Sequence, residues 1–176
     1  MHIKQVDSDG RIILPQEYRR MLTLKNGSSV AISLSDEKIE IMRYQDIDAV
    51  KHTVKKAINS HYAAYGLPIV ACDEEKIFSS CGLDYQALSG TSLPANVKRQ
   101  VERNYEYVCR DPEHMLHLVD GSELVIKMIA PLRKDNRAIG AIMLIGCAES
   151  FKEVQGEWNK SITLLTSLIQ QQINMM

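Results

Sequence analysis

Residues 6–22 have the sequence VDSDGRIILPQEYRRML, and the architecture of the N-terminal part of the chain follows from this stretch. Its DSDG segment is typical of a turn, because Asp caps free amides and Gly adopts positive φ. Pro15 suits the first position of a helix, where its missing N–H is not needed. We therefore expect strands at 3–6 and 11–14, followed by a helix over 16–22.

A second hairpin is expected directly after this helix. Segments 30–34 and 38–42 alternate apolar and polar residues around a turn at 35–37, which gives the order ββαββ. The first 45 residues contain roughly a dozen large apolar side chains, too few for a stable core at this length. This part must pack on the rest of the chain or complete its core with a second copy, and the second option predicts an obligate dimer.

Residues 46–176 have the pattern of a separate domain that contains both helices and strands. The expected fold class of the chain is α+β. Val50, Val54 and Ile58 lie at helical spacing, and Gly66 ends that segment. The charged segment 133–137 is typical of a hairpin turn between two long strands. The expected helices are 47–65, 94–106 and 150–176, and the expected strands are 69–72, 76–79, 123–132 and 138–146.

The last expected helix carries a broad apolar stripe. Such a stripe could pack only on its own sheet, or it could also form a helical bundle between subunits together with the 47–65 helix. Its width and length favour the bundle, and we expect a homotetramer of two dimeric heads. The stripe consists of Phe151, Val154, Trp158, Ile162, Leu165, Leu168, Ile169, Ile173 and Met176.

Composition limits the classes of function. The chain has 176 residues, 45% hydrophobic and 24% charged, with a net charge of -1, so bulk charge predicts no polyanion partner. Residues 1–45 hold seven Lys/Arg and six Asp/Glu, so any nucleic-acid contact must come from a local basic face. The longest apolar run, 138–147, is too short to span a membrane, and no signal peptide is visible. We expect a cytoplasmic protein.

The 6–22 stretch resembles the signature of the AbrB family of bacterial transcriptional regulators. The resemblance lies in an apolar–Asp pair, Gly-Arg, three apolar residues, Pro, and Glu-x-Arg-Arg-x-Leu; residues 36–44 are similar to the closing strand of the same family. It implies a swapped-hairpin fold, in which two chains interdigitate into one small β-barrel over residues 1–45. It also implies a sequence-preferring, nucleoid-associated regulator of transcription, including a role in sporulation.

The resemblance implies that double-stranded DNA is bound by Lys4, Arg11, Arg19 and Arg20. Lys4 stands where the family often has Arg, and Lys neutralises a phosphate without making the bidentate contact to guanine. Asp7 and Gly10 are expected to shape the turn, and Glu17 to hold an arginine in position.

Residues 46–176 are similar to GAF domains, which implies a regulatory and oligomerisation domain with an antiparallel sheet flanked by helices. The similarity is carried by residues 131–132, a charged turn, and 139–142. A small-molecule effector would be bound by Tyr105, Tyr107 and Arg110, on the segment that covers the pocket in that fold. The alternative is a solvated lid. No cofactor is expected.

Two other functions remain open. An antitoxin would share the swapped-hairpin head, although antitoxins usually end in a short flexible tail. A GAF-fold, cysteine-dependent reductase would need paired thiols, whereas Cys72, Cys81, Cys109 and Cys147 are widely spaced. No metal-ligand spacing is present, and we do not expect an enzyme.

Overall fold

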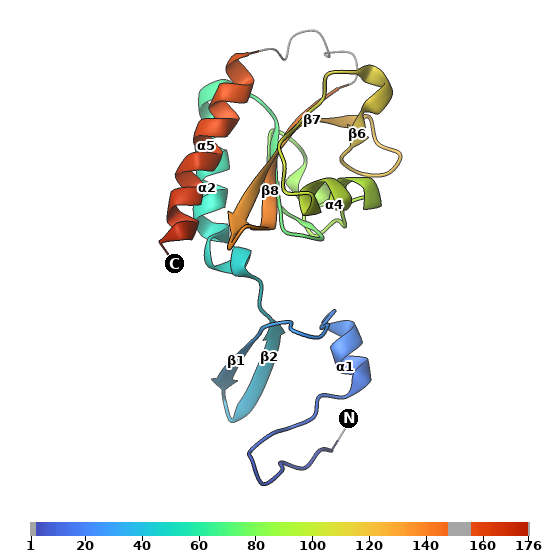
Figure 1. Ribbon diagram of the computed structural model, residues 1–176, viewed down its shortest axis with the longest axis vertical. Helices are drawn as coiled ribbons and strands as arrows, with labels where there is room; N and C mark the ends of the chain where they lie inside the picture. Colours follow the sequence, from blue (N-terminus) through green and yellow to red (C-terminus); the bar gives the residue numbers. More distant parts are fainter. Residues whose placement is uncertain (1–2, 148–155, 176) are drawn as a thin grey trace. The chain divides into compact units, whose positions relative to one another are not determined.

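A computed structural model of the chain describes residues 3–147 and 156–175 (Figure 1). The chain divides into two compact units, Met1–Gln45 and Asp46–Met176. Among the described residues, no helix is both long enough and apolar enough to cross a membrane.

The first unit contains one short helix and one hairpin. These are α1 (Gln16–Met21), β1 (Val30–Ser35) and β2 (Lys38–Arg43). The turn between the strands places Asp36 and Glu37 at φ 46° and 64°, the left-handed conformation of a tight two-residue hairpin. The expected helix and the expected second hairpin are confirmed to within one residue at each end.

The expected strands at 3–6 and 11–14 are wrong for the single chain, because both segments lack strand pairing. The turn between them does form: the Gly10 amide donates to the Asp7 carbonyl at 3.0 Å, and the Asp7 amide donates to the Arg11 carbonyl at 3.0 Å. A strand requires a neighbour for its backbone groups. Within one chain the hairpin does not extend beyond its turn, and the order ββαββ is not reached.

The second unit is built on one antiparallel sheet with the strand order β4-β3-β8-β7-β5, and β6 also pairs with β7. The central β7–β8 hairpin and its charged turn are confirmed, with each strand longer than expected. The strand expected at 76–79 begins and ends slightly later. The strands are β3 (Ile69–Cys72), β4 (Ile77–Cys81), β5 (Tyr107–Val108), β6 (Leu116–His117), β7 (Leu124–Lys134) and β8 (Arg137–Cys147).

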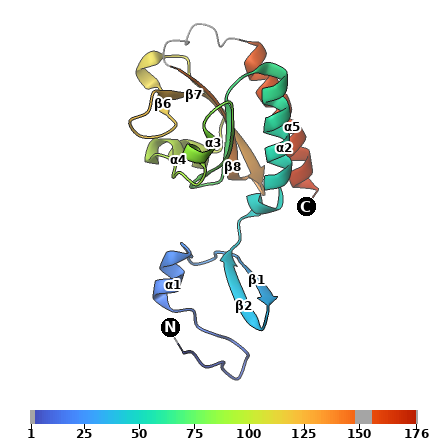
Figure 2. The same ribbon diagram turned by 180° about the vertical axis from the view of Figure 1, so that it is seen from behind.

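Helices cover both faces of this sheet, so the α+β class with an antiparallel sheet flanked by helices is confirmed. Helices α2 and α5 lie side by side on one face, and α3 and α4 lie on the other (Figures 1 and 2). The helices are α2 (Lys51–Tyr65), α3 (Tyr85–Leu88), α4 (Ala95–Glu102) and α5 (Glu157–Asn174), with short 3-10 turns η1 (Asp46–Ala49) and η2 (Pro112–His114).

Three helix boundaries differ from the sequence expectation. Helix α2 begins at Lys51 rather than at 47, because residues 46–49 form the 3-10 turn η1. Helix α4 ends at Glu102 rather than at 106, because Asn104 takes a left-handed φ of 60° and the Arg133 guanidinium donates to its carbonyl and to its side-chain oxygen, both at 2.9 Å. Helix α5 begins at Glu157; the expected start near residue 150, with Phe151 and Val154, lies outside the described residues.

Most of the apolar stripe of α5 packs on its own unit. Ile162, Ile169 and Ile173 are buried in one core cluster with Val54 and Ile58 of α2. Leu168 is the exception, with 54% of its surface exposed. The stripe therefore stabilises this unit, and one edge of it remains available on the surface.

Candidate functional site

None of the described residues of the first unit, 3–45, is buried. One face of its hairpin is nevertheless apolar, because Ile32 pairs with Ile41 and Leu34 pairs with Ile39 across the strands. Ile32, Leu34 and Ile39 are 67%, 76% and 63% exposed. A contiguous apolar face in water marks an interaction surface. We call the face formed by Val30, Ile32, Leu34, Ile39 and Ile41 the hairpin face.

An open groove of about 530 Å³ lies within this unit. The hairpin face contributes two isoleucines to its wall, and α1 contributes Tyr18 and Met21, of which Met21 is 80% exposed. The groove is therefore an apolar surface that this unit leaves uncovered. Its lining consists of Lys4, Ile12, Leu14, Pro15, Tyr18, Met21, Leu22, Ile39 and Ile41.

The four expected DNA-contacting residues are all exposed and come from three segments of the first unit. Lys4 borders the groove, Arg11 follows the Asp7–Gly10 turn, and Arg19 and Arg20 occupy the last turn of α1. The structure thus places these cations on the surface of one small unit. Their positions are compatible with phosphate contact, and the DNA role itself stays a prediction.

The turn that presents Arg11 is stabilised by a single carboxylate. Asp7 accepts hydrogen bonds from the amides of Asp9 and Arg11 at 3.0 and 2.7 Å, and Gly10 has a φ of 77°. The expected turn roles of Asp7 and Gly10 are confirmed. The Arg11 guanidinium lies 3.0 Å from the Asp9 carboxylate in an exposed pair, which is weak enough to open for a phosphate.

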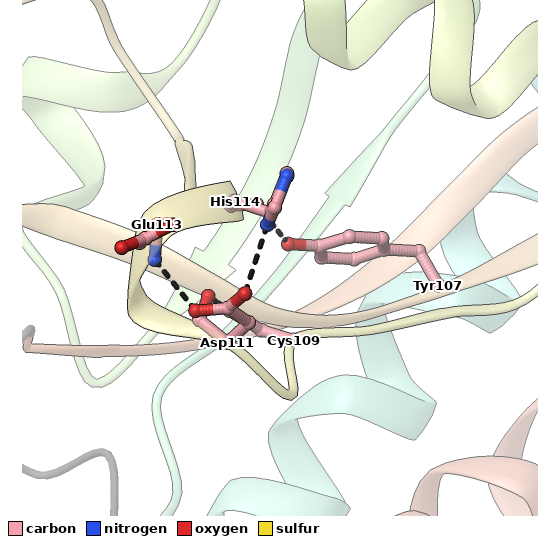
Figure 3. Close-up of polar contacts among 5 residues, drawn as sticks. All are labelled: Tyr107, Cys109, Asp111, Glu113 and His114. Atoms are coloured by element: carbon pink, nitrogen blue, oxygen red, sulfur yellow. Dashed lines mark hydrogen bonds and ion pairs between the residues drawn. The ribbon is translucent and has the colours of Figure 1, made fainter.

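The second candidate region is the segment before and after η2 (Figure 3). Asp111 accepts from the Glu113 amide at 2.9 Å and lies 3.0 Å from Nδ1 of His114, and these two contacts lower the pKa of Asp111. The Tyr107 hydroxyl donates to the His114 carbonyl at 2.9 Å, and the Cys109 thiol points to the Asp111 carbonyl at 3.7 Å. The segment is therefore held in place by its own side chains.

The three expected effector-binding residues do not share one environment. Tyr107 is half-buried and packs against the second core cluster; burial, and then the neighbouring Cys109 thiol, raise its pKa. Tyr105 is 75% exposed, and Arg110 is also exposed. Leu93, Val97, Val101, Leu118 and Met143 are among the apolar side chains that pack in the same cluster on this side of the sheet. Effector binding by the three residues stays a prediction.

Two buried titratable groups were not singled out from the sequence. Lys127 of β7 is 1% exposed, and burial lowers its pKa. His61 of α2 is 5% exposed; its Nε2 lies 2.9 Å from the Ser161 hydroxyl of α5, and burial lowers its pKa. Neither follows from spacing alone, because a single polar residue inside an apolar pattern shows its burial only in three dimensions.

The four thiols are free and differ in exposure: Cys72 and Cys81 are buried, Cys109 is intermediate and Cys147 is exposed. Burial raises the pKa of Cys72 and of Cys81, which favours the protonated form of both thiols. Within residues 3–147 and 156–175, no group of three or more His, Cys, Asp or Glu side chains is arranged to hold a metal ion.

No family model matches the chain. The sequence is 20% identical over 156 residues to Stage V sporulation protein T of Bacillus subtilis (strain 168), in an alignment that covers 87% of each chain. A GAF domain/HD domain protein from Geobacter sulfurreducens gives a TM-score of 0.49 at 12% identity, over 76% of this chain and 100% of that one. A proposed transcriptional regulator from Rhodococcus sp. RHA1 gives 0.41 at 12% identity, over 90% and 84%.

Proposed function

We propose that this chain is a homo-oligomeric, DNA-binding transcriptional regulator. Residues 1–45 of two chains combine into one swapped-hairpin β-barrel, which presents two copies of Lys4, Arg11, Arg19 and Arg20 to the DNA backbone. The proposal is supported most by one observation: the first unit buries none of its described residues, 3–45, yet carries an apolar face and an open apolar groove.

The hairpin face and the groove are both uncovered apolar surfaces of the first unit. A second copy of this unit brings one more of each, so it can cover both. In a two-fold dimer each chain contributes the same patch, so the hairpin face of one chain can cover the groove of the other. The segments 3–6 and 11–14 would then also gain neighbours for their backbone groups. The resemblance to the AbrB family supports the same arrangement, and the similarity to the sporulation protein along 87% of the chain supports the regulatory role.

The second unit acts in this proposal as the oligomerisation and regulatory domain. Residues 161–174 of α5 contain no charged side chain, and Leu164 and Leu168 are 60% and 54% exposed on that helix. An uncharged helix surface with exposed leucines favours packing against the same helix of another subunit. Two dimeric heads joined in this way give the tetramer. Control of sporulation genes and association with the nucleoid belong to the same proposal.

Effector binding is the part of the regulatory role that the geometry supports least, because Tyr107 is bound to its own segment and Tyr105 is 75% exposed. We therefore favour regulation through assembly. A thermal-shift screen of metabolites tests the alternative, since a ligand that binds the folded state raises its melting temperature. The antitoxin and reductase alternatives gain no support from a packed second unit whose cysteines Cys72 and Cys81 are buried.

A gel-retardation experiment on the full chain tests DNA binding. Arg19→Ala/Arg20→Ala should abolish retardation while leaving the oligomer intact, because these guanidinium groups supply phosphate contacts and bury nothing in α1. Lys98→Ala/Arg99→Ala is the matched control, since it removes the same charge from α4 of the second unit. If the first variant retards DNA as well as the wild type does, the assigned face is wrong.

A further inference from the structure

The loop between α1 and β1 contains the one Asn-Gly pair of the sequence, Asn26-Gly27. The Ser28 amide donates to the Lys25 carbonyl at 3.1 Å, so Asn26 and Gly27 occupy the two central positions of a β-turn. The Lys25 amide in turn donates to the Ser28 hydroxyl at 2.9 Å. Both central residues are exposed, and Gly27 has a φ of 80°. The ends of the turn are therefore held together while its centre faces the solvent.

Two groups at the centre of this turn can react with each other. Within residues 3–147 and 156–175, neither the Asn26 side chain nor the Gly27 amide forms a hydrogen bond. No other part of the chain lies within 4 Å of the position that a Cβ of Gly27 would take, so nothing shields its nitrogen from the preceding carboxamide. A bond between the Gly27 nitrogen and Cγ of Asn26 closes a five-membered ring.

We propose that Asn26 is a site of spontaneous deamidation, which adds a negative charge to the first unit and weakens its binding to DNA. The Gly27 nitrogen bonds to Cγ of Asn26 and loses its proton, while the carboxamide nitrogen takes up a proton and leaves as ammonia. Water then opens the ring. Attack at Cγ gives aspartate, and attack at the main-chain carbonyl gives isoaspartate, in which the chain runs through Cβ and Cγ. Either product carries one carboxylate.

The other asparagines do not combine these features. Each of the six is followed by a residue that has a Cβ. Asn59 lies inside α2, where its Oδ1 accepts from the Cys81 thiol. Asn136 is the most similar case, because it is exposed and lies in the two-residue turn of the β7–β8 hairpin. However, the next residue, Arg137, belongs to β8 and pairs with Lys134. Asn136 is therefore a matched control within the same chain.

The new carboxylate lies close to the helix that carries Arg19. The Leu24 amide donates to the Arg19 carbonyl at 2.7 Å, and Asn26 follows Leu24 by two residues, which span at most about 7 Å. Residues 1–45 hold seven Lys/Arg and six Asp/Glu, so one added carboxylate removes the net positive charge of this unit. The effect on DNA rests on the proposed function: a carboxylate at this place repels the phosphates that Arg19 is proposed to contact.

Peptide mapping by mass spectrometry tests the modification on the full chain. The protein is incubated at mildly alkaline pH in water enriched in heavy oxygen, which is incorporated when the ring is hydrolysed. Asn26 should convert several times faster than Asn136, and its rate should rise with pH because the deprotonated amide is the nucleophile. Gly27→Ala should slow the conversion, since its Cβ crowds the attacking nitrogen. Equal conversion of Asn26 and Asn136 in the wild type would overturn the proposal.

Gel retardation of full-length variants tests the consequence for DNA binding. Asn26→Asp should bind a duplex about twofold more weakly per chain than Asn26→Gln at low salt, because a charge about 10 Å from another contributes that much in water. The difference should shrink as the salt concentration rises. Equal affinities of the two variants at low salt would overturn the proposed effect on DNA. Failure of the wild-type chain to bind the duplex would instead overturn the proposed function, while the mapping result would still decide the modification.

Discussion

Replacement of Ile32 by Asn should dissociate the heads of the oligomer. Ile32 is 67% exposed in the single chain and lies in the middle of the hairpin face, opposite Ile41. Burying the exposed part of such a side chain contributes about 2 kcal/mol, and placing an amide there costs about 1 kcal/mol more. Because the change occurs in both chains, the dimer should lose about 6 kcal/mol, which raises the dissociation constant by roughly four orders of magnitude.

Analytical ultracentrifugation of the full chain measures this effect. The Ile32→Asn variant should sediment as a smaller species than the wild type at the same concentration, with α5 still able to hold two chains together. Ser33→Asn is the matched control, because Ser33 points to the opposite, polar face of the same strand, across from Glu40. An Ile32→Asn variant with the wild-type sedimentation profile would refute the argument that this face is buried between chains.

Three further predictions concern the second unit. Burial lowers the pKa of His61, so unfolding takes up a proton below about pH 6.5, and the free energy of unfolding should fall as the pH drops from 7 towards 5. His61→Gln should weaken this dependence, while His52→Gln, on an exposed position of the same helix, should not; equal pH profiles for both variants would contradict the burial argument. Gly140→Ala should destabilise the unit by about 1–3 kcal/mol in a chemical denaturation experiment, because the new Cβ would lie 2.4 Å from the Cys72 carbonyl oxygen. An unchanged denaturation midpoint would show that β3 shifts to accommodate the methyl group without cost. Leu168→Gln should leave the melting temperature nearly unchanged but reduce assembly from tetramers to dimers in light scattering, since Leu168 is 54% exposed; persistent tetramers would exclude this helix surface as an interface.

Local patterns predicted the elements that one segment can specify alone. Alternation and turn residues located β1, β2 and the β7–β8 hairpin, and Pro15 located the start of α1. The left-handed pair Asp135 and Asn136 closes that long hairpin within its charged segment. In these cases the side-chain pattern and the turn residues indicate the same secondary structure, so contacts with the rest of the chain do not alter it.

Features that depend on distant parts of the chain were missed. The end of α4 is set by Arg133, which is 29 residues from Asn104 in the sequence. Lys127 is buried because β7 has neighbouring strands on both sides. The spacing of residues within β7 does not reveal these neighbours. The segments 3–6 and 11–14 have a strand pattern, but a strand also needs a neighbour, and one chain does not supply it.

The need for a partner was the most informative inference from the sequence, because it followed from counting apolar residues. A head of 45 residues with few large apolar side chains cannot bury them alone. The structure shows the lack of burial, since residues 3–45 contain no buried position; the second chain stays a prediction. Arg19 and Arg20 lie on α1, which has no buried residue. In the proposed dimer these two cations would therefore remain on the surface, where DNA could contact them.

The contribution of a second chain to the head can be observed directly by NMR. An equimolar mixture of isotope-labelled and unlabelled full-length chains should give intermolecular NOEs between methyl groups of Ile32, Leu34 or Ile39 and residues of the other chain. A well-folded head whose methyl groups show NOEs only within their own chain would contradict the account.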